Sequence, residues 1–368
     1  MNGKELLISA INKVIFNRDV FPTHIGADML KELFVTAKGQ DFGHIAAVAA
    51  ENVADNPIKP YFEKEKLLAI YRREQLDFAQ QEICDLLCRN SVEFMVLKGG
   101  IIKDFYPEGF MRTSSDIDIL VKPADAERAF GILSDAGYEY KEKSLNDYHF
   151  YAKNGTHIEL QFRFEVGNDE SNRVLERAWE SAVGFENGLR MSDEFLVFYN
   201  LAHAYYHFTC GGCGVKPFVD HIIMENALNY DKNAFAVLVK EGGLEAFYNG
   251  FTALCGVWFG EGTHTELTKQ MESYIFSGGV YGNDKNLGKA QGQKTGRGKY
   301  FFRRIFKPKK ELAAQYPRLE KHPILLPFYQ VRRWFNLFGK AKRKTAKAEM
   351  DGIFNSAELK DMFKQLGI

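Results

Sequence analysis

An aspartate pair inside an apolar run, Asp116 and Asp118, constrains this chain more than any other feature. Side chains alternate between the two faces of a strand, so a strand over residues 115–121 places both carboxylates on one face. The opposite face then carries Ile117, Ile119 and Val121. Two neighbouring carboxylates repel each other unless one is protonated or a cation binds between them. Because Mg²⁺ prefers carboxylate and phosphate oxygens, the pair predicts a metal site that handles phosphates.

The segment just before this pair has the pattern of a phosphate-binding turn. An apolar run at residues 94–97 predicts a strand, and Gly99 and Gly100 follow it directly after Lys98. Glycines let the backbone approach a phosphate because no Cβ is in the way. A helix beginning at Ile101 would also direct its first amide N–H groups at an anion. Strand, glycine pair, helix and aspartate strand together predict phosphoryl-transfer chemistry.

A third carboxylate is expected from a hairpin further along the chain. Strands predicted at residues 147–152 and 156–164 flank Asn154 and Gly155, a strong turn signal. One face of the second strand carries polar side chains, namely His157, Glu159 and Gln161. Glu159 would therefore stand near the aspartate pair if the two strands are neighbours. A solvated strand face is the alternative interpretation.

The segment VLKGG…YPEGFMRTSSDIDILV resembles the motif of the polymerase-beta-type nucleotidyltransferase superfamily. In particular, it is similar to the bacterial family known as uncharacterised nucleotidyltransferases. The superfamily motif covers about residues 94–160. The family likeness continues through the histidine-rich helix and FSGGVYG to the PILLP segment. We therefore expect an α+β fold, with a small mixed β-sheet nucleotidyltransferase core and helical N-terminal and C-terminal regions.

The resemblance also implies roles for single residues in moving a nucleoside monophosphate from an NTP to an acceptor hydroxyl. Asp116 and Asp118 would hold the nucleotide-side Mg²⁺, and both with Glu159 would hold a second Mg²⁺, with Mn²⁺ as an expected substitute. Glu159 would also accept the acceptor's proton. The residues expected at the donor nucleotide are Lys98, Gly99, Gly100, Arg112, Ser114 and Ser115. For the lysine, the arginine and the serines, a surface ion pair or a strand-entry cap is equally consistent.

A helix predicted at residues 194–208 offers a second group of polar side chains. His203 and His207 lie four residues apart and share a helix face. Cys210 and Cys213 follow, which allows a zinc site, although Gly-Gly-Cys-Gly is equally a helix stop. Alternatively, His203 and His207 line one side of the substrate cleft or lie hydrogen-bonded in the core. Lys216 and Asp220 could likewise contact the substrate in this cleft, or form a structural ion pair.

At 368 residues the chain is long enough for two or three domains. We expect four regions: a helical N-terminal region at 1–90, the nucleotidyltransferase core at 91–165, a helical domain at 166–275, and a basic loop with a C-terminal helical segment at 276–368. Net charge is zero but uneven, since residues 271–368 hold 21 Lys+Arg against 8 Asp+Glu and the remainder holds 27 against 40. The basic part predicts an acidic partner, or contact with the acidic part.

Within the basic part, the segment from Gly288 to Gly298 has too few apolar side chains to bury, so we expect it to form a loop. The basic, aromatic segment at residues 327–347 suits peripheral membrane contact, a nucleic-acid contact or a docked helix. The five cysteines form no even framework, and no run of eighteen apolar residues predicts a membrane helix. A cytoplasmic protein is therefore expected.

Three functional classes are consistent with an Asp-x-Asp motif. Glycosyltransferases that carry it need several βα units before the motif, and the helical pattern of residues 1–90 argues against them. The main prediction is a nucleotidyltransferase that binds an NTP, ATP included, and a small-molecule or protein acceptor; the lack of a base-stacking pattern disfavours nucleic acid. The alternative is a catalytically silent nucleotide- or partner-binding protein of the same fold, peripheral to a membrane.

Overall fold

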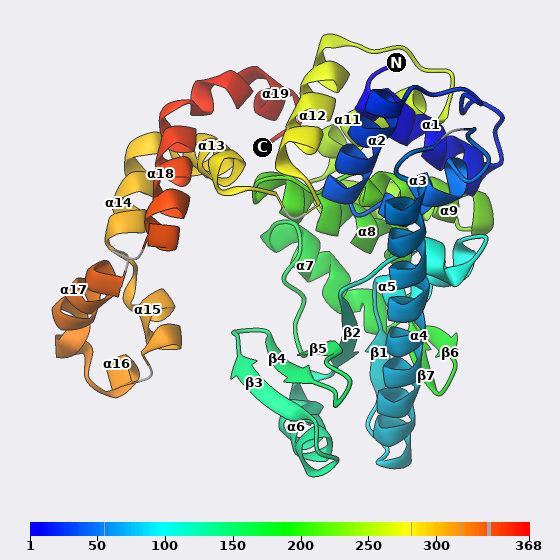
Figure 1. Cartoon of the computed structure of the whole chain (residues 1–368). Helices are drawn as coiled ribbons and strands as arrows, with labels where there is room; N and C mark the ends of the chain where they lie inside the picture. The colour runs from blue at the N-terminus through cyan, green and yellow to red at the C-terminus, as the bar shows by residue number, and fades with distance from the viewer. Residues whose placement is uncertain (55, 281, 317, 337–339) are drawn as a thin grey trace. The chain divides into compact units, whose positions relative to one another are not determined.

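The computed structural model describes residues 1–54, 56–280, 282–316, 318–336 and 340–368. The chain divides into two compact units. Unit 1 comprises residues 1–204 and 215–263, and unit 2 comprises residues 205–214 and 264–368. Unit 1 holds a β-sheet with helices packed around it, whereas the described part of unit 2 is helical (Figure 1).

Seven strands form one mixed sheet in unit 1, which confirms the predicted α+β fold class (Figure 1). The strands are β1 Phe94–Val96, β2 Asp116–Val121, β3 Glu139–Lys143, β4 Asp147–Tyr151, β5 His157–Gln161, β6 Val183–Phe185 and β7 Gly188–Arg190. Their spatial order is β3-β4-β5-β2-β1-β7-β6. β2 and β5 are parallel neighbours, as are β1 and β7, and the remaining pairs are antiparallel. The two strands predicted to carry the acids therefore lie side by side.

The sheet buries one face and leaves polar side chains on the other. Ile117 and Ile119 of β2 are buried, as the alternation along the strand predicts. Helix α6 (Ala126–Asp135) covers the same face at β4, where the Phe130 ring lies 4.9 Å from the Tyr148 ring and 5.4 Å from the Phe150 ring. Since neighbouring positions in a strand point to opposite faces, this packing turns the carboxylates of β2 and β5 away from α6.

The helical pattern predicted for residues 1–90 is confirmed, because four helices precede β1. Asn2 caps the first of them in a capping box with Glu5. The helices that lie wholly or partly in unit 1 are α1 Gly3–Phe16, α2 Ala27–Gly39, α3 Gly43–Ala49, α4 Lys59–Arg89, α5 Gly99–Ile102, α6, α7 Asp169–Glu176, α8 Asp193–Thr209, α9 Lys216–Ala227, α10 Lys232–Glu241 and α11 Glu245–Phe259. Short 3₁₀ helices occur at η1 Lys103–Phe105, η2 Gly109–Met111, η3 Pro123–Asp125 and η4 Arg177–Trp179.

The β6–β7 hairpin lies in a stretch for which the sequence predicted only helix. Each of its strands is three residues long, too short for an alternating pattern to stand out. The chain turns at Glu186, which has a positive φ of 49°. Gly188 then packs against the Phe94 ring so closely that a Cβ would lie 2.3 Å from its Cε2 atom. Contact with β1, rather than local pattern, explains this hairpin.

The described part of unit 2 consists of helices. They are α12 Glu266–Gly278, α13 Asp284–Thr295, α14 Arg297–Ile305, α15 Lys309–Gln315, α16 Arg318–Lys321, α17 Leu326–Asn336, α18 Lys340–Phe354 and α19 Lys360–Gln365, with 3₁₀ turns η5 Pro323–Leu325 and η6 Ser356–Leu359. Over the described residues, we find no helix with both the length and the apolar character needed to cross a membrane.

Helix α13 corrects the loop that the sequence predicted at residues 288–298. The Asn283 side chain caps its first turn by accepting a hydrogen bond from the Asn286 amide. Gly288 then allows α18 to approach, since a Cβ there would lie 2.0 Å from the Glu349 carbonyl oxygen. Gly352 of α18 is the reciprocal case, since a Cβ added there would lie 2.0 Å from the Lys285 carbonyl oxygen. The prediction was wrong because it counted apolar side chains, whereas this helix packs through backbone contact.

Candidate active site

The structure brings the three predicted acids together on the polar face of the sheet. The parallel register of β2 and β5 pairs Asp118 with Glu159 and Asp116 with His157. One carboxylate oxygen of each acid lies within 4.8 Å of one from each of the other two. Asp118 is only 4% exposed, whereas Asp116 and Glu159 are partly exposed. We call Asp116, Asp118 and Glu159 the acid cluster.

Lys98 offsets part of the negative charge of the acid cluster, and Gln161 hydrogen-bonds to it. The Lys98 ammonium lies 2.6 Å from Asp118 Oδ1 and 3.9 Å from Glu159 Oε2. Gln161 Nε2 donates to the same Asp118 oxygen at 2.7 Å. Lys98 has φ 46° and ψ −123°, a conformation that non-glycine residues rarely adopt and that persists only where the surroundings hold it. The fold therefore holds a strained backbone at the residue whose ammonium meets the acids.

Even with the Lys98 ammonium in place, the acid cluster has more negative than positive charge. Burial raises the pKa of Asp118 to about 6, although Lys98 opposes this shift. Burial and the Asp118 carboxylate likewise raise the pKa of Asp116. Burial alone would lower the pKa of Lys98, but Asp118, Tyr199 and the other two carboxylates together outweigh it and raise that pKa. Three carboxylates around one ammonium form an all-oxygen donor set, which fits a hard divalent cation such as Mg²⁺ or Mn²⁺.

The glycine pair lies beside the acid cluster at the start of α5, directly after β1. A Cβ on Gly99 would lie 2.3 Å from Ser114 Oγ, and one on Gly100 would lie 2.5 Å from Gln80 Oε1. Both glycines therefore have a packing role that does not depend on a ligand. Ser114 is half-buried against Gly99, and Ser115 is exposed at the entrance of β2.

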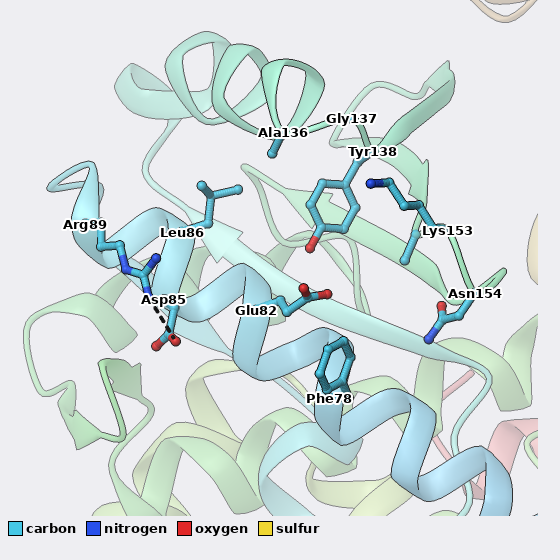
Figure 2. A pocket seen from close by; sticks show the side chains of 11 residues that line it. Phe78, Glu82, Asp85, Leu86, Arg89, Ala136, Gly137, Tyr138, Lys153 and Asn154 are labelled. Carbon is cyan, nitrogen blue, oxygen red and sulfur yellow. Dashed lines mark ion pairs between the residues drawn. The ribbon is translucent and has the colours of Figure 1, made fainter.

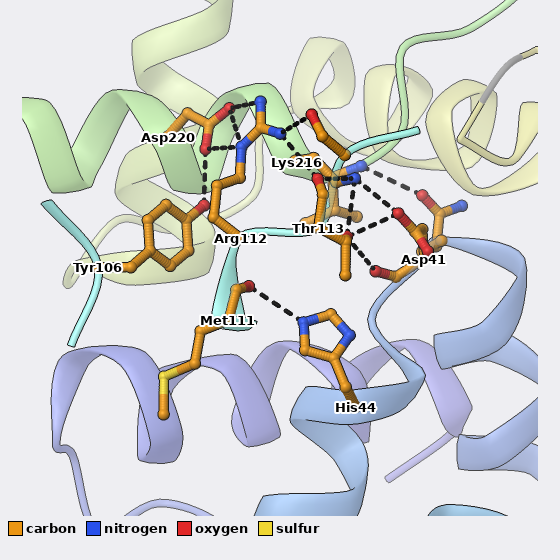
Figure 3. Close-up of polar contacts among 11 residues, drawn as sticks. Asp41, His44, Tyr106, Met111, Arg112, Thr113, Lys216 and Asp220 are labelled. Atoms are coloured by element: carbon orange, nitrogen blue, oxygen red, sulfur yellow. Dashed lines mark hydrogen bonds and ion pairs between the residues drawn. The ribbon is translucent and has the colours of Figure 1, made fainter. Parts of the chain in front are cut away.

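Arg112 is held by a second polar group rather than by the acid cluster. Its guanidinium donates to both carboxylate oxygens of buried Asp220 at 2.9 Å, and Tyr106 donates to Asp220 at 2.6 Å (Figure 3). Asp220 raises the pKa of Arg112 against the effect of burial. The guanidinium also donates to the Thr113 carbonyl oxygen at 2.8 Å and to Ser114 Oγ at 3.3 Å. These contacts fix the loop that leads into β2.

Lys216 braces the same loop from α9. Its ammonium lies 2.7 Å from Asp41 Oδ2 and donates to the Thr113 carbonyl oxygen at 3.0 Å (Figure 3). Burial would raise the pKa of Asp41, but Lys216 and Thr113 together lower it. We call these residues the brace network: Asp41, Tyr106, Arg112, Thr113, Lys216 and Asp220. Ion pairs inside the protein thus occupy Lys216 and Asp220, which the sequence assigned either to a substrate cleft or to such pairs.

His203 and His207 lie on α8, and the His203 ring stacks on Tyr199 with centroids 6.0 Å apart. Burial raises the pKa of the Cys213 thiol to about 12. Among the described residues, the groups close enough to share an ion contain neither these histidines nor Cys210 and Cys213. The geometry therefore does not support the zinc alternative.

Tyr199 is a residue of this region that the sequence analysis missed. It is buried, and its hydroxyl has no hydrogen-bond partner among the described residues. Burial and the carboxylates of Asp118 and Glu159 raise its pKa, while Lys98 opposes them, so the hydroxyl lies near the acid cluster. The one sequence signal was its position four residues before His203, on the same helix face.

A pocket of about 460 Å³ lies elsewhere in unit 1 (Figure 2). It is lined by one side of α4, the turn after α6 and the β4–β5 turn, with Phe78, Glu82, Tyr138, Lys153 and Asn154 among the lining residues. None of the acid cluster lines it. This pocket and the acid cluster are thus separate features of unit 1.

A mixed sheet that presents carboxylates from two parallel neighbouring strands, beside a strand–glycine–helix turn, defines a nucleotidyltransferase-like fold. Residues 42–260 match the family model described as uncharacterised nucleotidyltransferase, and the chain belongs to this family. The match includes the acid cluster and, apart from Asp41, the brace network, and it ends before the FSGGVYG and PILLP segments. Neither a comparison with curated proteins nor one with solved structures found a match.

Proposed function

We propose that this protein transfers a nucleoside monophosphate from an NTP to an acceptor hydroxyl and releases pyrophosphate. Membership of a nucleotidyltransferase family and the convergence of three carboxylates from β2 and β5 support this proposal. In the reaction, the acceptor oxygen bonds to the α-phosphorus and the bond from that phosphorus to the pyrophosphate oxygen breaks. The proton of the acceptor hydroxyl must leave, and the pyrophosphate must be stabilised.

The residues of the site would divide these tasks. Asp116 and Asp118 would hold one Mg²⁺, and both with Glu159 would hold another; the bound ions supply positive charge that offsets the phosphates. Glu159, whose side chain is 21% exposed, would accept the proton of the acceptor hydroxyl. Lys98 would pair with the donor phosphates from its position beside Asp118. The backbone at Gly99 and Gly100 would bind the β- and γ-phosphates.

The acceptor class of this proposal is a small molecule or a protein side chain that carries a hydroxyl group. No base-stacking module is evident in the sequence, which disfavours a nucleic-acid acceptor. Arg112 takes no part in this proposal, because both of its guanidinium edges are already engaged by Asp220, Thr113 and Ser114.

The test is incubation of the full chain with each of four α-labelled NTPs, Mg²⁺ and a cell extract. Label should pass from one NTP to a metabolite or protein, and Asp116→Asn should abolish this transfer because it removes one metal ligand. Asp28→Asn is the matched control, since the Asp28 side chain is 99% exposed. Equal labelling by wild type and Asp116→Asn would overturn the proposal. Mg²⁺-dependent NTP binding without transfer would instead identify a silent nucleotide-binding member of the family.

A further inference from the structure

Two histidines lie beside the acid cluster on neighbouring antiparallel strands. His149 of β4 pairs with Glu159 of β5 across the sheet, and His157 is two residues before Glu159. The two imidazole rings are nearly parallel, at 4°, and His149 Nδ1 lies 3.0 Å from His157 Nε2. One ring nitrogen of each histidine and a Glu159 carboxylate oxygen all lie within 4.8 Å of one another. The arrangement places three ligand atoms around one point.

A carboxylate lies beside one of the two rings. Asp147 Oδ1 lies 3.0 Å from His149 Nε2, although the approach is too bent to count as a hydrogen bond. Its negative charge favours the tautomer that carries the proton on Nε2, which leaves a lone pair on Nδ1. A carboxylate behind a histidine is the usual support of metal-ligating imidazoles, because it sets the tautomer and raises the basicity of the ligand.

We propose that His149, His157 and Glu159 form a transition-metal site, distinct from the carboxylate site for Mg²⁺, in which Asp147 positions His149. Two imidazole nitrogens and one carboxylate are the donor set of borderline ions such as Zn²⁺ and Co²⁺, whereas Mg²⁺ takes oxygen ligands. Ligands about 2.0–2.1 Å from a tetrahedral ion are roughly 3.3 Å apart, so the 3.0 Å nitrogen separation requires only a small opening. The side chains of His149 and Glu159 are each 21% exposed, so an ion reaches them from solvent.

Glu159 links the new site to the site of the proposed function. It belongs to both groups of ligands, so an ion held by the histidines changes the charge and position of a carboxylate that the Mg²⁺ site needs. Binding at the two sites is therefore coupled, and by linkage each ion alters the affinity for the other by the same factor. This coupling depends on the proposed function, whereas the histidine site itself does not.

The test is a titration of the full-length, metal-stripped protein with Co²⁺, followed by visible absorption, and with Zn²⁺, followed by calorimetry. Wild type should bind one ion with the spectrum of nitrogen ligation. His149→Ala and His157→Ala should each weaken binding at least tenfold, and Asp147→Asn should weaken it about tenfold as an orienting residue. His24→Ala, which changes an exposed histidine, is the matched control and should bind as wild type.

Asp116→Asn separates this proposal from the proposed function. It should lose nucleotidyl transfer yet keep Co²⁺ binding, because Asp116 is not in the histidine group. The proposal is overturned if wild type does not bind Co²⁺, or if both histidine variants, folded by circular dichroism, bind it as wild type does. It is equally overturned if Asp116→Asn alone removes Co²⁺ binding, since the ion would then occupy the carboxylate site.

Discussion

The acid cluster and the brace network are two polar groups inside the same unit, and they differ in how their charges balance. In the brace network each buried charge has an opposite partner, Arg112 with Asp220 and Lys216 with Asp41. In the acid cluster three carboxylates share one ammonium, and the hydroxyl of nearby Tyr199 has no hydrogen-bond partner in the part of the chain that the structure describes. Satisfied buried charges stabilise a conformation, whereas an unbalanced group costs stability and persists where function needs it. The comparison is the basis for proposing a structural role for the first group and a chemical role for the second.

The largest expected effect is the loss of activity in Asp118→Asn. Loss of a carboxylate that holds a catalytic metal costs several kcal/mol of transition-state stabilisation, which corresponds to a rate lower by about three orders of magnitude. Mn²⁺ binding, followed by electron paramagnetic resonance, should weaken with it. The thermal midpoint should change little, because the substitution removes an unbalanced charge. Asp28→Asn serves again as the control. If Asp118→Asn lost stability as well as activity, the acid cluster would behave like the brace network, and the difference between the two groups would be contradicted.

The brace network should show the opposite behaviour in Asp220→Ala. This substitution leaves the Arg112 guanidinium buried without its partner, so the free energy of unfolding should fall by about 3–5 kcal/mol in a urea titration. The double variant Arg112→Met/Asp220→Leu should recover much of that loss, because neither buried charge remains. A loss below about 1 kcal/mol in the single variant would contradict a structural role for this pair.

Acid should weaken unit 1 through His44, whose Nε2–H donates to the Met111 carbonyl oxygen at 3.0 Å (Figure 3). Burial lowers the pKa of His44 from 6.5 to about 4. Between pH 6.5 and pH 4, His44 is therefore protonated in the unfolded chain but not in the folded chain. The stability contribution is complete above pH 6.5 and decreases as the pH falls toward 4. The loss should reach about 3 kcal/mol, at about 1.4 kcal/mol for each unit of pKa shift.

Urea titrations at pH 7, 6, 5 and 4 measure this loss. His44→Gln should flatten the pH dependence, and His24→Gln, at an exposed position, should keep the wild-type slope. The buried His221 has a pKa lowered to about 4 for the same reason, so a residual slope should remain in His44→Gln. Identical slopes in wild type and His44→Gln would show that His44 is not the titrating group.

The smallest expected effect is that of Tyr199→Phe. Its hydroxyl has no partner among the described residues, so its removal should change the free energy of unfolding by less than about 1 kcal/mol. If the hydroxyl binds a charged group of the substrate, KM should rise about tenfold. Tyr230→Phe is the matched control, because Tyr230 is also buried with an unpartnered hydroxyl. An unchanged KM in Tyr199→Phe would remove Tyr199 from the site.

Local pattern predicted the acid strands well, because the two-residue period of a strand fixes which side chains share a face. Asp116, Asp118 and Glu159 follow that rule, and the parallel pairing of β2 with β5 then brings them together. The same rule placed His157 and Gln161 on that face, although it did not show that Gln161 donates to Asp118.

Contacts across long stretches of chain could not be predicted in this way. Arg112 and Asp220 are 108 residues apart, and no local pattern indicates that they pair. Lys98 was expected at phosphates, and its ion pair with Asp118 depends on a strained turn that composition does not encode. The β6–β7 hairpin and α13 were missed for the same reason, since each is stabilised by contact with a distant element.

The crossing of α13 and α18 places an unusual limit on how unit 2 can vary. At Gly288 and Gly352 the obstacle to a larger residue is a main-chain carbonyl oxygen of the opposite helix, which every amino acid carries. No compensating substitution in the facing helix can therefore make room for even one methyl group. A selection for second-site suppressors of Gly288→Ala should recover only reversion to glycine, or changes that move a whole helix.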